Sequence, residues 1–190
     1  VDALLRAFDA LGLSSVDVYA RFTSAPLALE LARQATNRVH ALALDGLPPA
    51  GAAERRALWK QFCPALPPRW DGSHLLALWH RLRDQELTWP WYERSATGIR
   101  RRSADLDAGR LHAATVDLAR QPGSYGDAAL AALEVDLKQV LRSVEQPLLL
   151  VADPQDPRDS GIAKLARLAR AASTVTRPAT AEELAAVVRT

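Results

Sequence analysis

The apolar run PLLLVA at 147–152 constrains the fold of this chain more than any other segment. It has the length of a β-strand, contains no polar position, and ends in the turn-forming sequence DPQDP. A strand with one solvent-exposed face alternates apolar and polar residues, whereas a uniformly apolar strand is buried on both faces. The run therefore predicts a parallel sheet that is covered by helices.

Helical and strand-like segments alternate around this run with short connections. The predicted strands lie at 16–19, 38–44, 147–152 and 173–176. The predicted helices lie at 4–11, 26–32, 162–169 and 180–188. The last helix opens with a capping-box pair, Thr180 and Glu183. This order is typical of an α/β fold with a parallel sheet.

The middle of the chain, 48–143, has a different pattern, because prolines separate helical segments and no strand-like run occurs. It contains all the tryptophans, which are Trp59, Trp70, Trp79, Trp89 and Trp91. We expect a discontinuous α/β core at 1–47 and 144–190, with an all-helical cap at 48–143. The aromatic residues form either a compact helical core or the lining of a pocket. In the second case, Trp79, Trp89 and Trp91 would contact a small apolar ligand under the cap.

Composition and charge exclude several classes of function. The formal net charge of +2 does not indicate a nucleic-acid-binding protein, and the basic run Arg100, Arg101 and Arg102 is interpreted as a solvated helix end. No stretch approaches the roughly 18 apolar residues of a membrane span. The N-terminus also lacks the apolar core of a signal peptide, so we expect a cytoplasmic protein. The single cysteine, Cys63, excludes an intrachain disulfide and a multi-cysteine metal site and is expected to be structural.

The order of these parts resembles the α/β-hydrolase superfamily from its fifth strand onward, over essentially the whole chain. VDALLRAFDALGLSSVDVYA resembles the helix that leads into strand five, and RFTSAPLALELARQATNRVHALALDGLP the nucleophile turn, the next helix and strand six. WDGSHLLALWHRLRDQELTWPWYERSA resembles the cap of one uncharacterised branch, and PLLLVADPQDP strand seven with its acid loop. The resemblance implies the last four strands of an α/β-hydrolase-like parallel sheet, flanked by helices, and no metal or cofactor.

The resemblance also implies a nucleophile on a sharp strand-to-helix turn. The turn aligns with ARFTS at 20–24, whose two ends are small, as the turn requires. Its central residue is Phe22, and a phenyl ring cannot attack a carbonyl carbon. The neighbouring hydroxyls of Thr23 and Ser24 are either displaced nucleophiles or residues that begin and cap the following helix.

The other two catalytic groups of the family are a carboxylate and a histidine base. Asp153 or Asp156 follows strand seven, where the family keeps its acid, although Asp-Pro turns also have purely conformational roles. Asp45, after strand six, is a second possible acid or a turn residue. No histidine follows strand eight, because 173–190 contains none. His74, in the cap, is the remaining candidate base, with packing or hydrogen bonding within the cap as its alternative role.

These observations leave three hypotheses. The first is a non-catalytic protein that uses the cap as a ligand lid, because both the nucleophile and the base are missing. The second is an active hydrolase of a small apolar ester or amide with an atypical catalytic set. The third is a chain that functions with another part: strands one to four are absent, so the edge of strand five is open to a second copy or to a complementing N-terminal segment.

Overall fold

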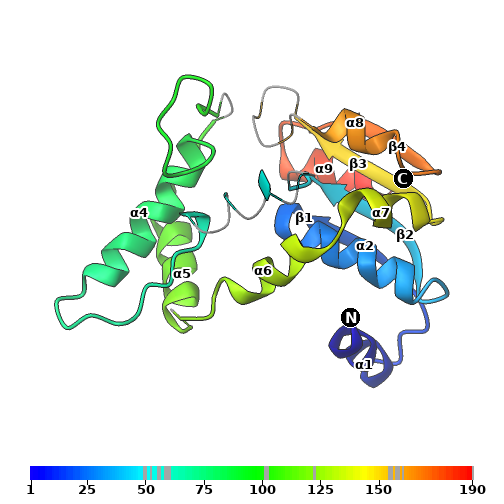
Figure 1. Cartoon of the computed structure of the whole chain (residues 1–190), viewed down its shortest axis with the longest axis horizontal. Coiled ribbons are helices and arrows are strands. Elements are labelled where there is room, and N and C mark those ends of the chain that lie inside the picture. The colour runs from blue at the N-terminus through cyan, green and yellow to red at the C-terminus, as the bar shows by residue number, and fades with distance from the viewer. Residues whose placement is uncertain are drawn as a thin grey trace. The chain divides into compact units, whose positions relative to one another are not determined.

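The structure, a computed structural model, describes residues 1–48, 51, 53–54, 57, 61–100, 103–121, 123–153, 156, 159 and 161–189 (Figure 1). The chain divides into two compact units. The first contains 1–52, 132–154 and 158–190, and the second contains 53–131 and 155–157.

The first unit contains a four-stranded sheet with the strand order β1-β2-β3-β4. The strands are β1 (Val16–Arg21), β2 (Val39–Asp45), β3 (Leu148–Ala152) and β4 (Ala172–Thr176). Every neighbouring pair is parallel, which confirms the predicted fold class. Among the described residues, β1 pairs only with β2, so it forms one edge of this sheet.

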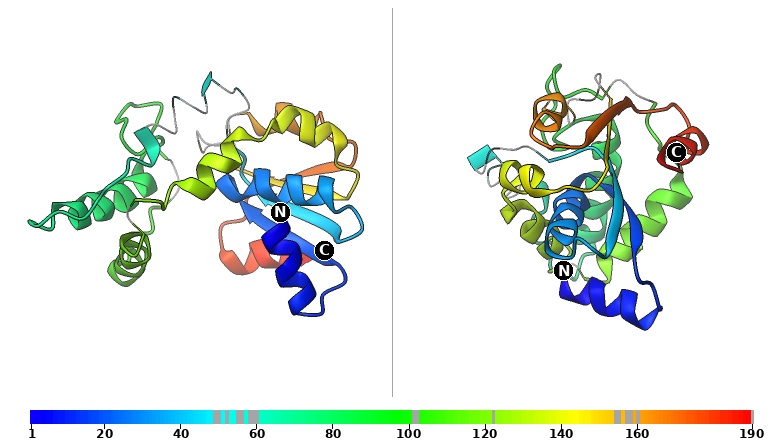
Figure 2. Two further views of the ribbon diagram at one scale, coloured as in Figure 1. Left: turned by 60° about the horizontal axis from the view of Figure 1, so that its bottom comes forward. Right: turned by 90° about the vertical axis from the view of Figure 1, so that its right-hand side faces the viewer.

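Helices cover both faces of this sheet (Figure 2, right). The bounds of the helices of this unit are α1 (Asp2–Ala10), α2 (Ala25–Gln34), α7 (Leu137–Ser143), α8 (Ile162–Ala166) and α9 (Ala181–Arg189). α2, α7 and α8 lie on one face, and α9 lies on the other. The predicted capping box of α9 is confirmed, because the Thr180 N–H donates to Glu183 Oε2 and the Glu183 N–H donates to Thr180 Oγ1, both at 3.1 Å.

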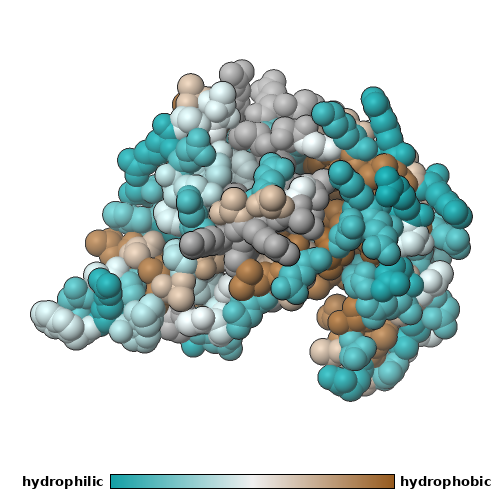
Figure 3. Space-filling view, in the orientation of Figure 1, coloured by the Kyte–Doolittle hydropathy of each residue, from teal (hydrophilic) through white to brown (hydrophobic). Residues whose placement is uncertain are grey.

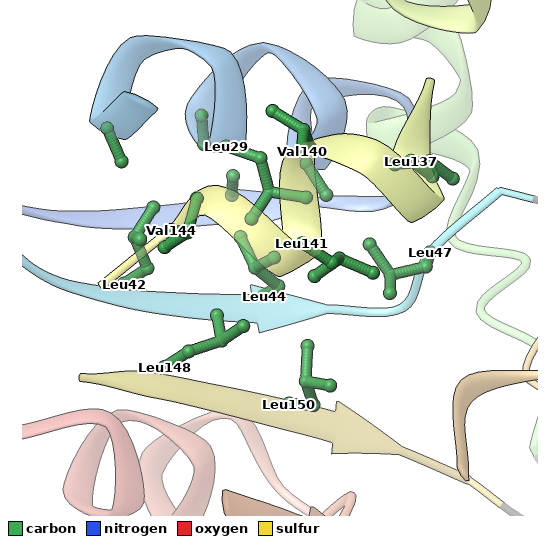
Figure 4. Close-up of a cluster of buried hydrophobic side chains, with 14 of the residues drawn as sticks. Leu29, Leu42, Leu44, Leu47, Leu137, Val140, Leu141, Val144, Leu148 and Leu150 are labelled. Atoms are coloured by element: carbon green, nitrogen blue, oxygen red, sulfur yellow. The ribbon is translucent and has the colours of Figure 1, made fainter. Parts of the chain in front are cut away.

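The main hydrophobic core lies between the sheet and the helices α2 and α7 (Figure 4). Leu29 of α2 and Leu141 of α7 are fully buried against Leu44 of β2 and Leu150 of β3. Each buried leucine contributes about 2 kcal/mol of hydrophobic free energy. The apolar run at 147–152 is a central strand because its two neighbours and the helices bury it, as the sequence predicted.

The described part of the second unit is helical, with α4 (Ser73–Leu87) and α5 (Ala108–Ala119) as its longer elements. The boundary between the units along the chain falls within α6 (Asp127–Glu134). An isolated antiparallel bridge joins Thr88 to Ile99 and closes the loop that follows α4.

A cluster around Phe62 forms part of the interior of this unit. The buried Arg81 donates through Nε to the Phe62 carbonyl at 2.9 Å, and the Trp91 indole Nε1 donates to the same oxygen at 3.0 Å. The Trp89 ring packs edge-on against the Phe62 ring, with centroids 5.0 Å apart. Cys63 is half-buried beside Arg81, and burial raises the pKa of its thiol. The thiol is therefore protonated at neutral pH, in keeping with a structural role.

The interpretation of the basic run as a solvated helix end was wrong for Arg100. This side chain is buried, and its guanidinium donates to Asp156 Oδ2 from Nη2 at 2.9 Å and from Nε at 3.1 Å. Its Nη1 also donates to the Gln85 carbonyl at 2.7 Å. Sequence patterns cannot show a partner that lies 56 residues away. Arg101 and Arg102 lie outside the described residues.

Candidate functional site

The turn between β1 and α2 contains the candidate nucleophile position. It is a short 3-10 segment, η1 (Phe22–Ser24), that leads directly into α2. Phe22 has a φ of +46°, and it is the one non-glycine residue with a positive φ in the described part of the chain. A bulky residue in this region is strained, and such strain concentrates at functional turns. The backbone therefore makes a sharp strand-to-helix turn centred on a phenylalanine.

The Ser24 hydroxyl stabilises this turn. Ser24 Oγ accepts a hydrogen bond from the Arg21 N–H and donates to the Arg21 carbonyl, both at 2.9 Å. Its proton is thus held by a backbone oxygen. Ser24 is also the residue that precedes α2, but its side chain makes no capping hydrogen bond to that helix.

Asp45 lies at the carboxyl end of β2, and three side chains contact its buried carboxylate. The Tyr19 hydroxyl donates to Oδ2 at 2.9 Å, and Arg21 Nε lies 3.3 Å from the same oxygen. The Arg177 guanidinium makes an ion pair with Oδ1. The Asp45 side chain is 1% exposed, so these contacts replace the water that would otherwise solvate its charge.

Arg177 extends this network to a second carboxylate. It follows β4 directly, and its N–H donates to the Ala152 carbonyl at 2.8 Å. Its Nη2 lies 3.5 Å from Asp159 Oδ2, which also accepts the Asp153 N–H at 2.7 Å. We call the five side chains of this network the carboxyl-end cluster: Tyr19, Arg21, Asp45, Asp159 and Arg177.

Gly46 lies where the carboxyl-end cluster meets the turn. Its φ is +81°, and a Cβ added to it would lie 3.1 Å from Asp159 Oδ1 and 4.0 Å from Phe22 Cδ2. The Phe22 ring and the Asp159 carboxylate therefore both approach the Gly46 backbone. Only a residue without a side chain fits this close approach without strain.

The environment of Tyr19 keeps its hydroxyl protonated. Burial and the hydrogen bond to Asp45 raise the pKa of Tyr19 to about 12. The phenol consequently keeps its proton at neutral pH, and that proton is directed at Asp45. Tyr19 is therefore unsuited to act as a base or a nucleophile in this arrangement.

The structure places the predicted site residues in different surroundings. Thr23 is half-buried in the turn beside Phe22, and Asp153 is half-buried after β3. Asp156 is 3% exposed and belongs to the second unit, where it pairs with Arg100. His74 also belongs to the second unit, and its Nδ1 accepts the Arg69 N–H at 3.0 Å.

The tryptophans that were predicted to line a pocket also lie in different surroundings. Trp89 and Trp91 pack around Phe62, and Trp79 is half-buried on α4. Trp70 is fully exposed, and Trp59 lies outside the described residues.

A pocket of about 540 Å³ does occur in the second unit, between the end of α4 and the loop that follows it. None of the tryptophans that the structure describes lines it. Its lining residues are Arg83, Asp84, Leu87, Thr88, Arg94, Ser95, Ala96 and Ile99.

The described residues hold no group of three or more His, Cys, Asp or Glu side chains that could bind a metal ion. Within the same residues, no helix is both long enough and apolar enough to cross a membrane.

No protein-family model and no curated protein matches this chain. Several solved structures do match it. Against MenH from S. aureus the TM-score is 0.67 at 17% identity, with 99% of this chain and 71% of that chain covered. For a hydrolase from Pseudomonas aeruginosa PA01 the TM-score is 0.66 at 19% identity, with 99% of this chain and 67% of that chain covered. For MGS-M2, an alpha/beta hydrolase enzyme from a Medee basin deep-sea metagenome library, the TM-score is 0.65 at 12% identity. This match covers 98% of this chain and 68% of that chain.

The chain has an α/β-hydrolase fold. The match extends over nearly the whole chain but over only about two thirds of these structures. At identities below 20%, the likeness establishes the arrangement of the elements and leaves the chemistry to the residues of the site.

Sequence reasoning missed most of the carboxyl-end cluster of this α/β-hydrolase fold. It considered Asp45 but not Tyr19, Arg21, Asp159 or Arg177. A usable signal was present, since Arg21, Asp45 and Arg177 each end or directly follow a strand. The carboxyl ends of parallel strands meet at one edge of a sheet, so oppositely charged residues there are expected to pair.

Proposed function

We propose that this chain is a non-catalytic member of the α/β-hydrolase fold that functions by binding. The proposal rests on Phe22. This residue has a positive φ and lies at the centre of the strand-to-helix turn, where the fold keeps its nucleophile. A phenyl ring offers no atom that can attack a carbonyl. The turn is thus a degenerate nucleophile elbow.

The residue after β4 supports the same proposal. The family resemblance places the histidine base after the last strand, and Arg177 follows β4 here. A guanidinium stays protonated at physiological pH and cannot accept a proton. Its ion pairs with Asp45 and Asp159 also engage Asp45, one of the candidate acids.

The alternative is an active hydrolase of a small apolar ester or amide that uses Thr23 or Ser24, Asp153 or Asp156, and His74. An alkyl fluorophosphonate distinguishes the two, because it phosphonylates an activated hydroxyl irrespective of the acyl substrate. We expect no adduct on the folded chain by intact-mass spectrometry, with a known serine hydrolase as the positive control. An adduct mapped to Thr23 or Ser24 would establish the alternative.

We propose further that the second unit is a cap that holds a small apolar ligand. Leu87 and Ile99 support this, because they line the 540 Å³ pocket and are 41% and 54% exposed without a ligand. Short-chain esters should raise the melting temperature of the chain and should fail to do so in Ile99→Glu, whose unliganded stability should be unchanged. An equal shift in both proteins would place the ligand elsewhere.

The remaining proposals concern location and partners. The protein is cytoplasmic and binds neither nucleic acid nor membranes. The open edge of β1 is an association surface, for a second copy of the chain or for a complementing segment, because unpaired N–H and C=O groups at an edge are a template for another strand.

A further inference from the structure

We infer that the pocket of about 540 Å³ in the second unit binds its ligand as a carboxylate, with Arg94 as the residue that holds the charged end. The inference rests on the cap-ligand proposal made above, and it names the chemical class of the ligand. That class is a short-chain aliphatic carboxylate, which is apolar along its chain and carries one negative charge at its end.

One wall of the pocket is apolar, and its position is fixed by the backbone. The isolated antiparallel bridge places Thr88 opposite Ile99, and beside it the Arg100 N–H donates to the Leu87 carbonyl at 2.9 Å. Leu87 and Ile99 therefore reach the pocket from the two sides of this bridge, and both side chains are exposed. Binding an alkyl chain here would remove this apolar surface from water.

The carboxylate among the described lining residues, Asp84, is already paired within the wall of the pocket. Its side chain is 12% exposed. Arg83, its neighbour in the chain, donates to Asp84 Oδ1 from Nε at 2.8 Å and from Nη2 at 2.6 Å. Hydrogen bonds from a guanidinium to a carboxylate are charge-assisted and strong, so Arg83 compensates the charge of Asp84.

Arg94 is the second cation that lines the pocket. Its side chain is 77% exposed, and its Nη2 lies 3.4 Å from Asp84 Oδ2, which is longer than the roughly 2.7–2.9 Å of a charge-assisted hydrogen bond. Two arginines thus share one aspartate, and the described lining residues carry a formal charge of +1. A guanidinium has five N–H donors, so Arg94 can keep this contact and bind a second carboxylate.

The hydroxyl groups that line the pocket are already used within the protein. Thr88 Oγ1 donates to the Trp91 carbonyl at 3.3 Å, and Ser95 Oγ accepts the Gly98 N–H at 3.2 Å. The polar contact for a ligand therefore falls to Arg94. A planar guanidinium binds a planar carboxylate through two parallel hydrogen bonds, and a monoanion matches the single excess charge.

The test is a pair of calorimetric titrations of the folded chain, one with hexanoate and one with hexanamide, its uncharged counterpart. The native chain should bind hexanoate about tenfold more tightly, because charge-assisted hydrogen bonds are roughly twice as strong as neutral ones. Arg94→Gln removes the charge at an exposed position and should bind the two ligands equally. Its affinity for hexanamide should equal that of the native chain, which also shows that the variant is folded.

Arg120→Gln is the matched control. Arg120 directly follows α5 in the same unit, is 74% exposed, and lies 3.4 Å from Asp117. It therefore resembles Arg94 in exposure and in pairing but does not line the pocket. This variant should keep the native preference for hexanoate. Ile99→Glu, in the apolar wall, should lose both ligands.

Three results would overturn the inference. Equal affinities of the native chain for hexanoate and hexanamide would refute the carboxylate and leave the cap-ligand proposal in place. A preference for hexanoate that persists in Arg94→Gln would assign the charged end to another residue. If the native chain binds neither ligand, the inference fails, and the cap-ligand proposal fails with it only if short-chain esters also leave the melting temperature unchanged. None of these outcomes bears on the degenerate elbow, which the fluorophosphonate experiment tests separately.

Discussion

Asp45 occupies a position at which a charge is costly unless its partners are in place. Its side chain is 1% exposed, and Tyr19, Arg21 and Arg177 all contact its carboxylate. The cluster therefore couples the ends of β1, β2 and β4 through one buried charge. This edge of the sheet thus holds a network of ion pairs.

Replacing Asp45 by asparagine should lower the free energy of unfolding by about 3 kcal/mol, because Arg177 keeps its charge at a largely buried position and loses its nearest carboxylate. Urea denaturation followed by circular dichroism measures this. Asp17→Asn, at an exposed carboxylate on the neighbouring strand, should cost about 0.5 kcal/mol or less. Equal losses in the two variants would mean that the Asp45 network does not stabilise the fold.

Tyr19 should give the stability a dependence on alkaline pH. Its pKa is raised to about 12 in the folded chain, from an ordinary value near 10. The folded state thus holds the phenol proton more tightly, so this contribution is complete below pH ~10 and is lost as the pH rises toward ~12. Unfolding free energies at a series of pH values should fall more steeply across this window in the native chain than in Tyr19→Phe. Parallel curves for the two proteins would refute the assignment.

At the scale of elements, α1 is weakly attached to its unit. None of its residues is buried, Leu4 is 45% exposed, and hydrophobic surface is visible over the helix (Figure 3). Arg38 holds the connection between α1 and β1: its guanidinium donates to the Leu13 and Ser14 carbonyls at 2.9 and 2.8 Å and to Asp9 Oδ1 at 2.7 Å.

Arg38→Ala should therefore release α1 without unfolding the sheet. We expect a loss of about 1–2 kcal/mol in the free energy of unfolding, since three hydrogen bonds to a charged group disappear. Hydrogen exchange should accelerate in α1 and remain slow in β2 and β3. In Arg33→Ala, which removes a pair within α2, α1 should exchange as in the native chain. Unchanged exchange in α1 of Arg38→Ala would show that apolar contacts alone hold the helix.

The elements were predictable where one local pattern decides the structure. The uniform apolar run became β3, an inner strand of the sheet, and Thr180 and Glu183 formed the expected capping box. The side-chain network was not predictable in this way, since it depends on which strand ends become neighbours. Arg100 shows the same limit, because it was expected in solvent and its buried partner, Asp156, is 56 residues away.

At the scale of the whole molecule, the fold of the chain does not determine its chemistry. The sheet order and the match to solved structures establish an α/β-hydrolase fold over nearly the entire chain. The residues at the carboxyl edge of that sheet support a different use of the fold. Phe22 stands at the turn and Arg177 after β4, and both of these groups are unsuited to acyl transfer. We therefore propose that the chain uses this fold for binding.

The decisive measurement is the hydrolysis of short-chain p-nitrophenyl esters by the folded chain, with Thr23→Ala and Ser24→Ala measured beside it. Our proposal predicts that all three proteins give the rate of buffer alone. Turnover by the native chain that disappears in either variant would mean that a hydroxyl beside Phe22 is a displaced nucleophile, and the chain would then be an enzyme.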